Sequence, residues 1–241
     1  MANTCKCLLY RYLFTYHRLM NLPKKVWQKS WKNPFTYYQL VGSIRKTLIE
    51  RSSMILHIGA HKAQEASDYA LFDKSVIWIE ANPKFLGVIE REIYKFPKQK
   101  AFIALLGDKS NEEVNFYLSN NEGASSSIFN FGTEMNHKGL KMVSSISLSM
   151  KRLDQCFSSS EIKSGSHWVI DVQGAELKVL IGSGTLLDQA YSLEIEVSTK
   201  DEYLNGARFQ ELESFLKDKG FFPLWKPKEK SHEDLFFLRH N

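Results

Sequence analysis

Trp168-Val-Ile-Asp-Val-Gln-Gly-Ala-Glu176 is the most informative segment of the chain. Its apolar start predicts a buried strand that ends at Asp171, and Gly174 lets the backbone turn before a helix that begins near Glu176. In open sheets of parallel strands, ligands bind just beyond the carboxyl ends of the strands. We therefore expect Asp171 to lie at a binding or catalytic site.

Around this segment, short apolar runs alternate with stretches of helical periodicity, which is typical of an α/β fold with a parallel sheet. The last two apolar runs are joined by a charged turn and predict a C-terminal hairpin. Strands are expected at residues 54–58, 76–79, 101–106, 146–150, 167–170, 191–197, 221–225 and 235–238, and helices at 63–72, 84–95, 153–157, 176–181 and 209–219. Residues 114–118 are expected to extend the third strand as an outer hairpin or edge.

The polar segment 119–141 is predicted to be a long loop that forms a lid on the substrate side, since long loops inside compact domains are usually functional or mobile.

The chain divides into two parts of different charge. Residues 1–52 contain ten lysines and arginines and one acid, a net charge of +9, whereas the remainder carries 22 basic and 26 acidic residues, a net charge of −4. We predict a basic, aromatic-rich, helical N-terminal extension over 1–52 and a catalytic domain over 53–241. The extension either packs its aromatic side chains on the domain or lies on an anionic membrane surface. Nucleic-acid binding has no support beyond the charge.

Composition favours a cytoplasmic protein, membrane-peripheral if the extension binds lipid. The three cysteines, Cys5, Cys7 and Cys156, match neither a disulfide framework nor a zinc motif. No apolar run approaches the ~20 residues of a membrane-spanning helix. Charged residues interrupt the N-terminal apolar stretch, so we expect no signal peptide. The sequence makes no prediction of oligomeric state.

The turn Gly59-Ala60-His61 follows the first predicted strand and precedes a helix. Glycine lets backbone N–H groups approach a ligand, and a helix N-terminus favours a negative group. Ala63 stands where a dinucleotide-binding fingerprint has a further glycine, so a ligand with a carboxylate fits better than a pyrophosphate. Many such turns contain one glycine for steric reasons alone, so packing remains an alternative.

Two acids follow the next strands. Glu80 ends the second strand 21 residues after Gly59, where an acid binds the ribose hydroxyls of an adenosine cofactor; a solvated strand end is the alternative. Asp108 follows the third strand and either accepts from an adenine amino group or forms a turn.

Asp171 is the predicted catalytic residue, because a buried carboxyl with a raised pKa can orient or deprotonate a substrate hydroxyl. Glu176 either joins it or is an ordinary acid at a helix N-terminus. Ser125 and Ser126 are expected to hydrogen-bond a polar ligand rather than to act as nucleophiles. The histidines form no metal set, so no metal is predicted.

In these motifs the chain resembles the FkbM-type S-adenosylmethionine-dependent methyltransferases, from about Met54 to the C-terminus. The matching residues are Ile58-Gly59-Ala60-His61 with Gln64-Glu65, Trp78-Ile79-Glu80-Ala81-Asn82-Pro83, Leu106-Gly107-Asp108, residues 121–127, Asp171–Glu176 with Leu180, Glu194–Ser198 with Tyr203 and Gly206, and Gly220-Phe221.

The resemblance implies a class I methyltransferase (Rossmann-like) fold, a three-layer α/β sandwich whose mostly parallel seven-stranded sheet ends in an antiparallel hairpin. It implies S-adenosylmethionine as cofactor and O-methylation of a hydroxyl on a sugar, glycan or related metabolite. Asp171 is then the catalytic residue and Ser125, Ser126, Gln173 and Glu176 bind substrate. The cofactor-binding residues are Gly59, Ala60, His61, Glu65, Glu80, Ala81, Asn82 and Asp108.

Ala63 departs from the second glycine common in such turns, and we expect a tighter loop and weaker cofactor binding. Two rival functions remain, a non-catalytic or membrane-associated binding protein that keeps the fold, and an NAD-dependent oxidoreductase.

Overall fold

The computed structural model describes residues 34–229 and 232–240. The chain divides into two compact units, Met1–Arg51 and Ser52–Asn241. In the first unit, helix α3 (Pro34–Arg51) begins at a proline, whose fixed backbone angle suits the first helical turn. The predictions made for residues 1–33 lie outside the described residues. Within the described ranges, no helix is both long enough and apolar enough to cross a membrane.

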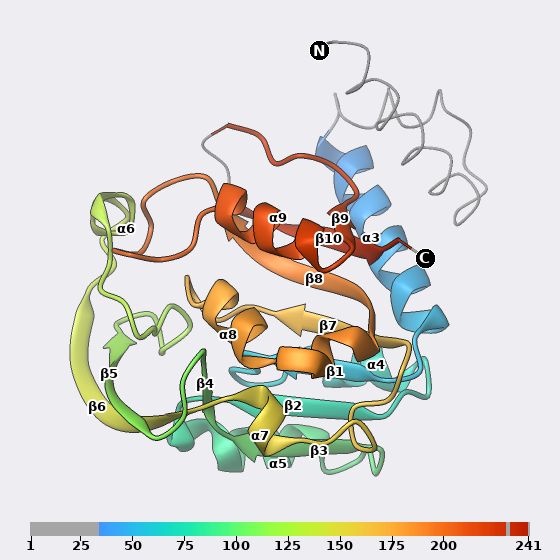
Figure 1. Ribbon diagram of the computed structural model, residues 1–241. Helices are drawn as coiled ribbons and strands as arrows, with labels where there is room; N and C mark the ends of the chain where they lie inside the picture. The colour runs from blue at the N-terminus through green and yellow to red at the C-terminus, as the bar shows by residue number, and fades with distance from the viewer. Residues whose placement is uncertain (1–33, 230–231, 241) are drawn as a thin grey trace. The chain divides into compact units, whose positions relative to one another are not determined.

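The second unit is built on a seven-stranded sheet in the order β3-β2-β1-β7-β8-β10-β9 (Figure 1). The first five strands in that order are parallel, and β10 is antiparallel to both of its neighbours. The bounds are β1 (Ile55–Ile58), β2 (Val76–Glu80), β3 (Gln99–Ile103), β7 (Ser166–Ile170), β8 (Ala190–Ser198), β9 (Phe221–Pro223) and β10 (His232–Arg239). The predicted class I methyltransferase fold is confirmed.

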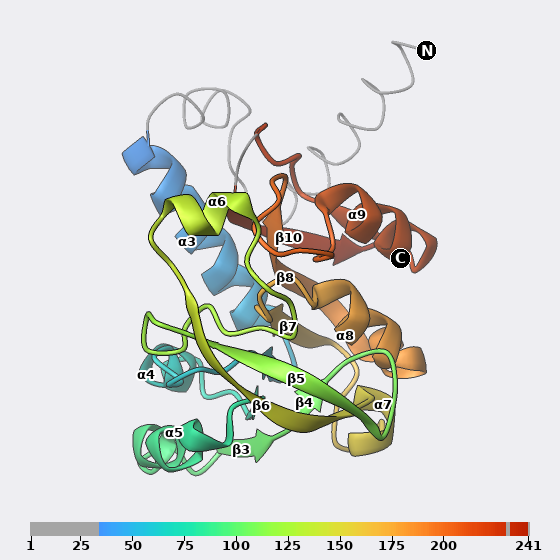
Figure 2. The same cartoon turned by 90° about the vertical axis from the view of Figure 1, so that its left-hand side faces the viewer.

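Helices cover both faces of this sheet, which is why β1 is buried along its whole length. Figure 2 shows α4 and α5 on one side of the sheet and α7, α8 and α9 on the other. The bounds are α4 (Ala66–Ala70), α5 (Leu86–Ile93), α7 (Leu153–Cys156), α8 (Glu176–Gly182) and α9 (Phe209–Asp218), with 3₁₀ turns η1 (Pro83–Phe85) and η2 (Gly184–Gln189).

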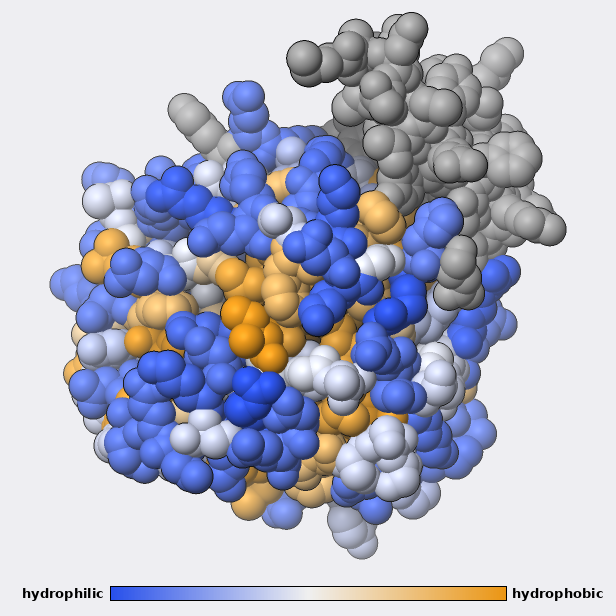
Figure 3. Space-filling view, in the orientation of Figure 1, coloured by the Kyte–Doolittle hydropathy of each residue, from blue (hydrophilic) through white to orange (hydrophobic). Residues whose placement is uncertain are grey.

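Helix α9 shows how the sequence sets this layering. Its apolar positions Phe209, Leu212 and Leu216 recur at helical spacing and are buried. Hydrophilic side chains cover most of the face on which α8 and α9 lie, with a smaller apolar group near its middle (Figure 3).

The prediction of one strand over residues 101–106 is wrong. The chain leaves the large sheet after Ile103, and β4 (Leu105–Leu106) pairs instead with β6 (Met142–Lys151). Strand β5 (Glu112–Ser119) pairs antiparallel with β6, so it does not extend the third strand. The second sheet has the order β4-β6-β5 and its own small core of Leu105, Phe116, Leu118 and Met150.

The predicted loop 119–141 joins β5 to β6 and is more ordered than expected. It contains helix α6 (Thr133–His137), and isolated bridges pair Tyr117 with Ser127 and Phe131 with Tyr203. Phe131 and Tyr203 are both buried, in a cluster with Met135. A helix of five residues is too short to show a helical period in the sequence. The contacts that order the segment are with residues far away in the chain, such as Tyr203, so the sequence pattern does not reveal them.

Gly182 explains how α8 packs against the turn after β4. A Cβ atom built at Gly182 would lie 1.8 Å from the backbone oxygen of Gly107, so only glycine permits this approach. We predict that Gly182→Ala lowers the free energy of unfolding by about 1–3 kcal/mol, the usual cost of overpacking. Chemical denaturation measures this difference.

Gly87→Ala is the matched control, because Gly87 lies in α5 and a Cβ atom there meets nothing within 4 Å. It should raise the free energy of unfolding by about 0.5–1 kcal/mol. Equal stability of the two variants would contradict the packing described for Gly182.

Candidate active site

A cavity of about 250 Å³ lies where the chain order of the sheet reverses, beyond the carboxyl ends of β1 and β7. Ligands bind at this position in open α/β sheets. The lining includes seven of the residues predicted for cofactor or catalysis, namely Gly59, Ala60, His61, Glu65, Glu80, Ala81 and Asp171, together with Ser126 and Gln173. Six further residues that line it were not predicted as site residues, namely His57, Gln64, Leu105, Leu106, Phe116 and Ile128.

Gly59 brings two edges of the cavity together. Its φ is +94°, and a Cβ atom there would lie 1.7 Å from the backbone oxygen of Asp171. The N–H groups of Gly59 and Ala60 donate to the carbonyl oxygen of Ile79 on the neighbouring strand. Any side chain at Gly59 would therefore push the turn after β1 away from the end of β7.

Ala63 lies in the same turn but does not reach the cavity. It is fully buried, and its φ of +53° is one that glycine adopts more readily than alanine. His61 shares this left-handed conformation with a φ of +45°. Alanine in place of glycine at position 63 therefore strains the backbone locally, behind the wall of the cavity. The side chain of Ala63 does not enter the cavity.

Glu80 ends β2 with both carboxylate oxygens held by backbone N–H groups. Oε2 accepts from the N–H of His61 and Oε1 from that of Asn82, each at 2.8 Å. Burial raises the pKa of Glu80 to about 6, although these hydrogen bonds oppose the rise. Each oxygen keeps further acceptor capacity. A rigid carboxylate in the cavity wall can thus accept from two neighbouring hydroxyls.

Asp171 shares a hydrogen-bond donor with a second, partly buried acid. The side-chain nitrogen of Gln173 lies 2.5 Å from Oδ1 of Asp171 and 2.7 Å from Oε2 of Glu196. Burial raises the pKa of Asp171 well above its usual range, and the nearby charge of Glu196 adds to the rise. Gln173, predicted as a substrate ligand, is thus also a bridge between two carboxyl groups.

Tyr203 fixes the orientation of this bridge. Its hydroxyl donates to Oε1 of Gln173, and burial raises the pKa of Tyr203, so the hydroxyl stays protonated. The same hydroxyl lies 3.3 Å from the backbone oxygen of Ser125. Because the amide oxygen of Gln173 accepts from Tyr203, its nitrogen must face the two carboxyl groups.

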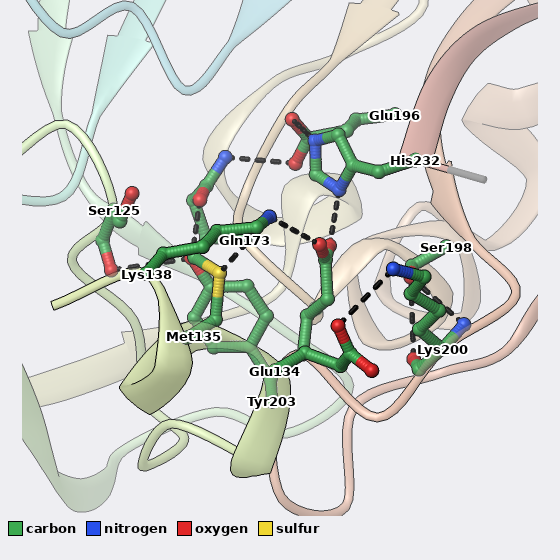
Figure 4. Close-up of polar contacts among 12 residues, drawn as sticks. Ser125, Glu134, Met135, Lys138, Gln173, Glu196, Ser198, Lys200, Tyr203 and His232 are labelled. Carbon is green, nitrogen blue, oxygen red and sulfur yellow. Dashed lines mark hydrogen bonds and ion pairs between the residues drawn. The ribbon is translucent and has the colours of Figure 1, made fainter. Parts of the chain in front are cut away.

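His232 balances the charge on Glu196 from the other side (Figure 4). Its Nε2 lies 2.6 Å from Oε1 of Glu196, and its Nδ1 bonds to Glu202. These two bonds raise the pKa of His232 to about 10, so the ring is a cation at neutral pH. Burial alone would raise the pKa of Glu202, but the bonds from His232 and Lys138 outweigh it and lower the value to about 2.

Glu176 does not face the cavity. It is buried at the start of α8, and its Oε1 accepts from the N–H groups of Val172 at 3.2 Å and Gly174 at 3.0 Å. Burial raises its pKa to about 7. Its geometry is that of a carboxyl group that holds the turn after β7, so the structure places it behind the predicted substrate site.

Asp108 is also outside the cavity. Both of its carboxylate oxygens lie 3.1 Å from Nζ of Lys178, and its backbone oxygen accepts from Arg152. The sequence could not predict this, because Lys178 is 70 residues away, on helix α8. The structure gives no geometric support to contact with an adenine.

Asn82 and Ser125 lie next to the lining without joining it. Asn82 is buried, and its side chain caps the start of η1 by accepting a hydrogen bond from the N–H of Lys84. Ser125 hydrogen-bonds to Asn121 and to Ser119. Of the two predicted serines, Ser126 lines the cavity.

The segment 121–128 crosses the cavity and is tied to both of its sides. Lys62 in the turn after β1 forms an ion pair with Glu122, and His61 lies 3.3 Å from the backbone oxygen of Glu122. On the other side, the hydroxyl of Ser127 donates to the backbone oxygen of Gln173 at 2.7 Å. This segment occupies the position expected of the predicted lid.

Glu196, Tyr203 and His232 were not predicted as site residues. Glu196 had a readable signal: β8 pairs with β7 in parallel, with Ile195 opposite Ile170, so the residues that follow them, Glu196 and Asp171, lie side by side at the carboxyl end of β7. No such signal pointed to His232. It lies on the strand after the charged turn, and only the antiparallel pairing of that strand with β8 brings it next to Glu196.

Among the described residues, no group of three or more histidine, cysteine, aspartate or glutamate side chains is placed to hold a metal ion.

Two solved structures illustrate the fold comparison. Precorrin-6y C5,15-methyltransferase from Geobacter metallireducens is 12% identical, with a TM-score of 0.43 over 82% of this chain and 88% of that chain. Magnesium protoporphyrin IX methyltransferase from Synechocystis PCC 6803, with bound S-adenosylmethionine, is 14% identical, with a TM-score of 0.39 over 93% of this chain and 89% of that chain. Likeness at this level carries no functional argument. No curated protein matches the chain.

A sequence family does match. The methyltransferase FkbM domain covers residues 57–223, which is more than half of the chain and includes all of the cavity lining. The chain therefore belongs to the FkbM methyltransferase family.

Proposed function

We propose that this protein is an S-adenosylmethionine-dependent methyltransferase that methylates a hydroxyl group of a sugar, glycan or related small molecule. The observation that carries the proposal is the cavity at the reversal of strand order, with Glu80 on one wall and Asp171 on the other. The family match supports methyl transfer as the reaction class.

The residues in the cavity fit this cofactor. Glu80 presents a buried carboxylate whose two oxygens are held in place, which suits the paired hydroxyls of a ribose. Gly59 and Ala60 line the cavity beside Asp171, so the turn after β1 would contact the methionine part. Leu105, Leu106, Phe116 and Ile128 provide an apolar wall of the kind a nucleobase packs against.

When bound, S-adenosylmethionine supplies a methyl group on a positively charged sulfur, which the acceptor oxygen attacks as the carbon–sulfur bond breaks and its electron pair stays on sulfur. The contribution of the protein is alignment, exclusion of water and removal of one proton. Asp171 accepts the acceptor's hydroxyl proton on its carboxylate, and Gln173 fixes the direction in which that carboxylate points. The segment 121–128 crosses the cavity and limits the access of water.

A hydroxyl acceptor suits the site because an ionised carboxylate at the cavity is a base for an oxygen-bound proton. The sugar or glycan as acceptor rests on the family resemblance. A screen of glycans and small hydroxyl compounds with isotopically labelled S-adenosylmethionine tests it. Label transfer only to nitrogen or carbon acceptors would refute the hydroxyl assignment.

The first prediction concerns the cofactor itself. S-adenosylmethionine and S-adenosylhomocysteine at 100 times their Kd should stabilise the full-length protein by about 2.7 kcal/mol, whereas NAD should not. Thermal denaturation with each ligand measures this. Stabilisation by NAD alone would favour an oxidoreductase, and stabilisation by none of the three would favour a non-catalytic protein.

The second prediction tests Glu80 as the ribose ligand. Glu80→Gln should weaken the binding of S-adenosylhomocysteine by about 1.5–3 kcal/mol, because a hydrogen bond to a charged group is lost. Titration calorimetry gives the affinity, and thermal denaturation shows that the variant is folded. Glu90→Gln, an exposed glutamate on α5, is the matched control and should bind normally. Unchanged affinity in Glu80→Gln would remove the ribose assignment.

The third prediction separates binding from catalysis at Asp171. Asp171→Asn should keep the affinity for S-adenosylhomocysteine within a few fold and lower turnover of the acceptor found by the screen by about 10²–10⁴-fold, the usual contribution of a general base. Asp218→Asn, an exposed residue at the end of α9, should leave both unchanged. Full turnover by Asp171→Asn would show that the proton leaves by another route.

A further inference from the structure

Two partly buried carboxyl groups, those of Asp171 and Glu196, share a single amide. The nitrogen of Gln173 has two hydrogens, and its distances of 2.5 and 2.7 Å to the two acids show that both are used. Tyr203 donates to the oxygen of the same amide and so prevents it from turning over. Two carboxylates held this close and away from water repel each other, and such a pair retains one proton.

The two members of this pair have different partners. Glu196 lies 2.6 Å from Nε2 of His232, a cation at neutral pH, and does not line the cavity. Asp171 lines the cavity, and within the described part of the chain no lysine, arginine or histidine forms an ion pair with it. The negative charge of the pair therefore belongs on Glu196 and the proton on Asp171.

Apart from His232, the other groups around Asp171 add negative charge or none. Glu80 on β2 and Glu176 at the start of α8 are buried acids that each feel the charge of Asp171. Tyr203 is neutral, and His57 and His61 line the same cavity on the side of β1. His232 on β10 is held by Glu196 and Glu202. The walls of the cavity are therefore suited to a ligand that brings its own positive charge.

We propose that the Asp171–Glu196 pair holds one proton in the cofactor-free protein and releases it when a cation enters the adjoining cavity, so that the charged methyl donor binds with loss of a proton and the neutral product binds without it. This inference rests on the proposed function, because it identifies the cation as the sulfonium of S-adenosylmethionine.

The physical reason is the positive charge that the ligand brings next to Asp171. A positive charge near a buried carboxyl group favours its ionised form, which lowers its pKa and sends the proton to solvent. Asp171 then faces the acceptor as a carboxylate and accepts the hydroxyl proton as the methyl group leaves. The product, S-adenosylhomocysteine, is a neutral thioether, so the protonated pair is the stable form again. Proton and charge are balanced over the cycle.

Titration calorimetry of the full-length protein tests this. The heats of binding of S-adenosylmethionine, S-adenosylhomocysteine and sinefungin, which carries an ammonium group in place of the sulfonium, are measured at about pH 6.5, where the α-amino groups are protonated. Repeating each titration in buffers of different ionisation enthalpy gives the number of protons released. The two cationic ligands should release about one proton more than S-adenosylhomocysteine.

The comparison between ligands removes contributions that all three share, including any change at Glu80 on binding the ribose. The difference in proton release between the cationic ligands and S-adenosylhomocysteine should disappear in Asp171→Asn, because the carboxyl group that holds the proton is absent. Glu90→Gln on the surface of α5 should keep it.

Infrared difference spectra give a second measurement that needs no variant. The band of a protonated carboxyl group should be lost when S-adenosylmethionine or sinefungin binds and kept with S-adenosylhomocysteine. Equal proton release by all three ligands, with no loss of this band, would overturn the proposal while leaving methyl transfer intact. Failure of all three to bind would instead refute the proposed function, and this proposal with it.

Discussion

The contact between the turn after β1 and the end of β7 is the constraint on which the site depends. The two strands are parallel and in register, and the N–H of Asp171 donates to the backbone oxygen of Ile58. One residue later the chains must part, and Gly59 allows this at a distance where any Cβ atom would collide with Asp171. The cavity opens at that divergence, so the turn after β1 and the carboxyl group of Asp171 are fixed by one feature of the sheet.

Placing charged groups at this edge of the sheet is energetically unfavourable, and each of the four acids there has partners that reduce the cost. Burial of an unpaired carboxylate is unfavourable, and the cost falls when hydrogen bonds or a cation compensate it. Glu80 and Glu176 are each held by two backbone N–H groups, whereas Glu196 has His232. Asp171 has one amide donor and a second acid beside it. It is the least compensated of the four, which is the condition expected of a group that changes its charge during the reaction.

Much of this fold could be predicted from the sequence because its central strands are apolar runs that end on recognisable residues. Glu80 ends β2 and Asp171 directly follows β7, close to where the pattern placed them, and parallel strands bring such ends to one edge. The prediction was wrong where pairing is decided at a distance. Residues 101–106 read as one strand, and only the partner β6 separates Leu105 from β3. Asp108 and Glu176 were predicted as ligands, and the structure places both outside the cavity lining, held by Lys178 and by backbone N–H groups that the sequence pattern did not show.

The C-terminal hairpin has a chemical consequence as well as a topological one. Because β10 runs antiparallel to β8, its first residue lies beside the carboxyl end of β8, which is the edge that carries the cavity. His232 reaches Glu196 for this reason. The FkbM domain match ends at residue 223, so this histidine lies outside the part of the chain that defines the family. The charge state of the carboxyl pair in the site is therefore set by a strand beyond the region that the family match covers.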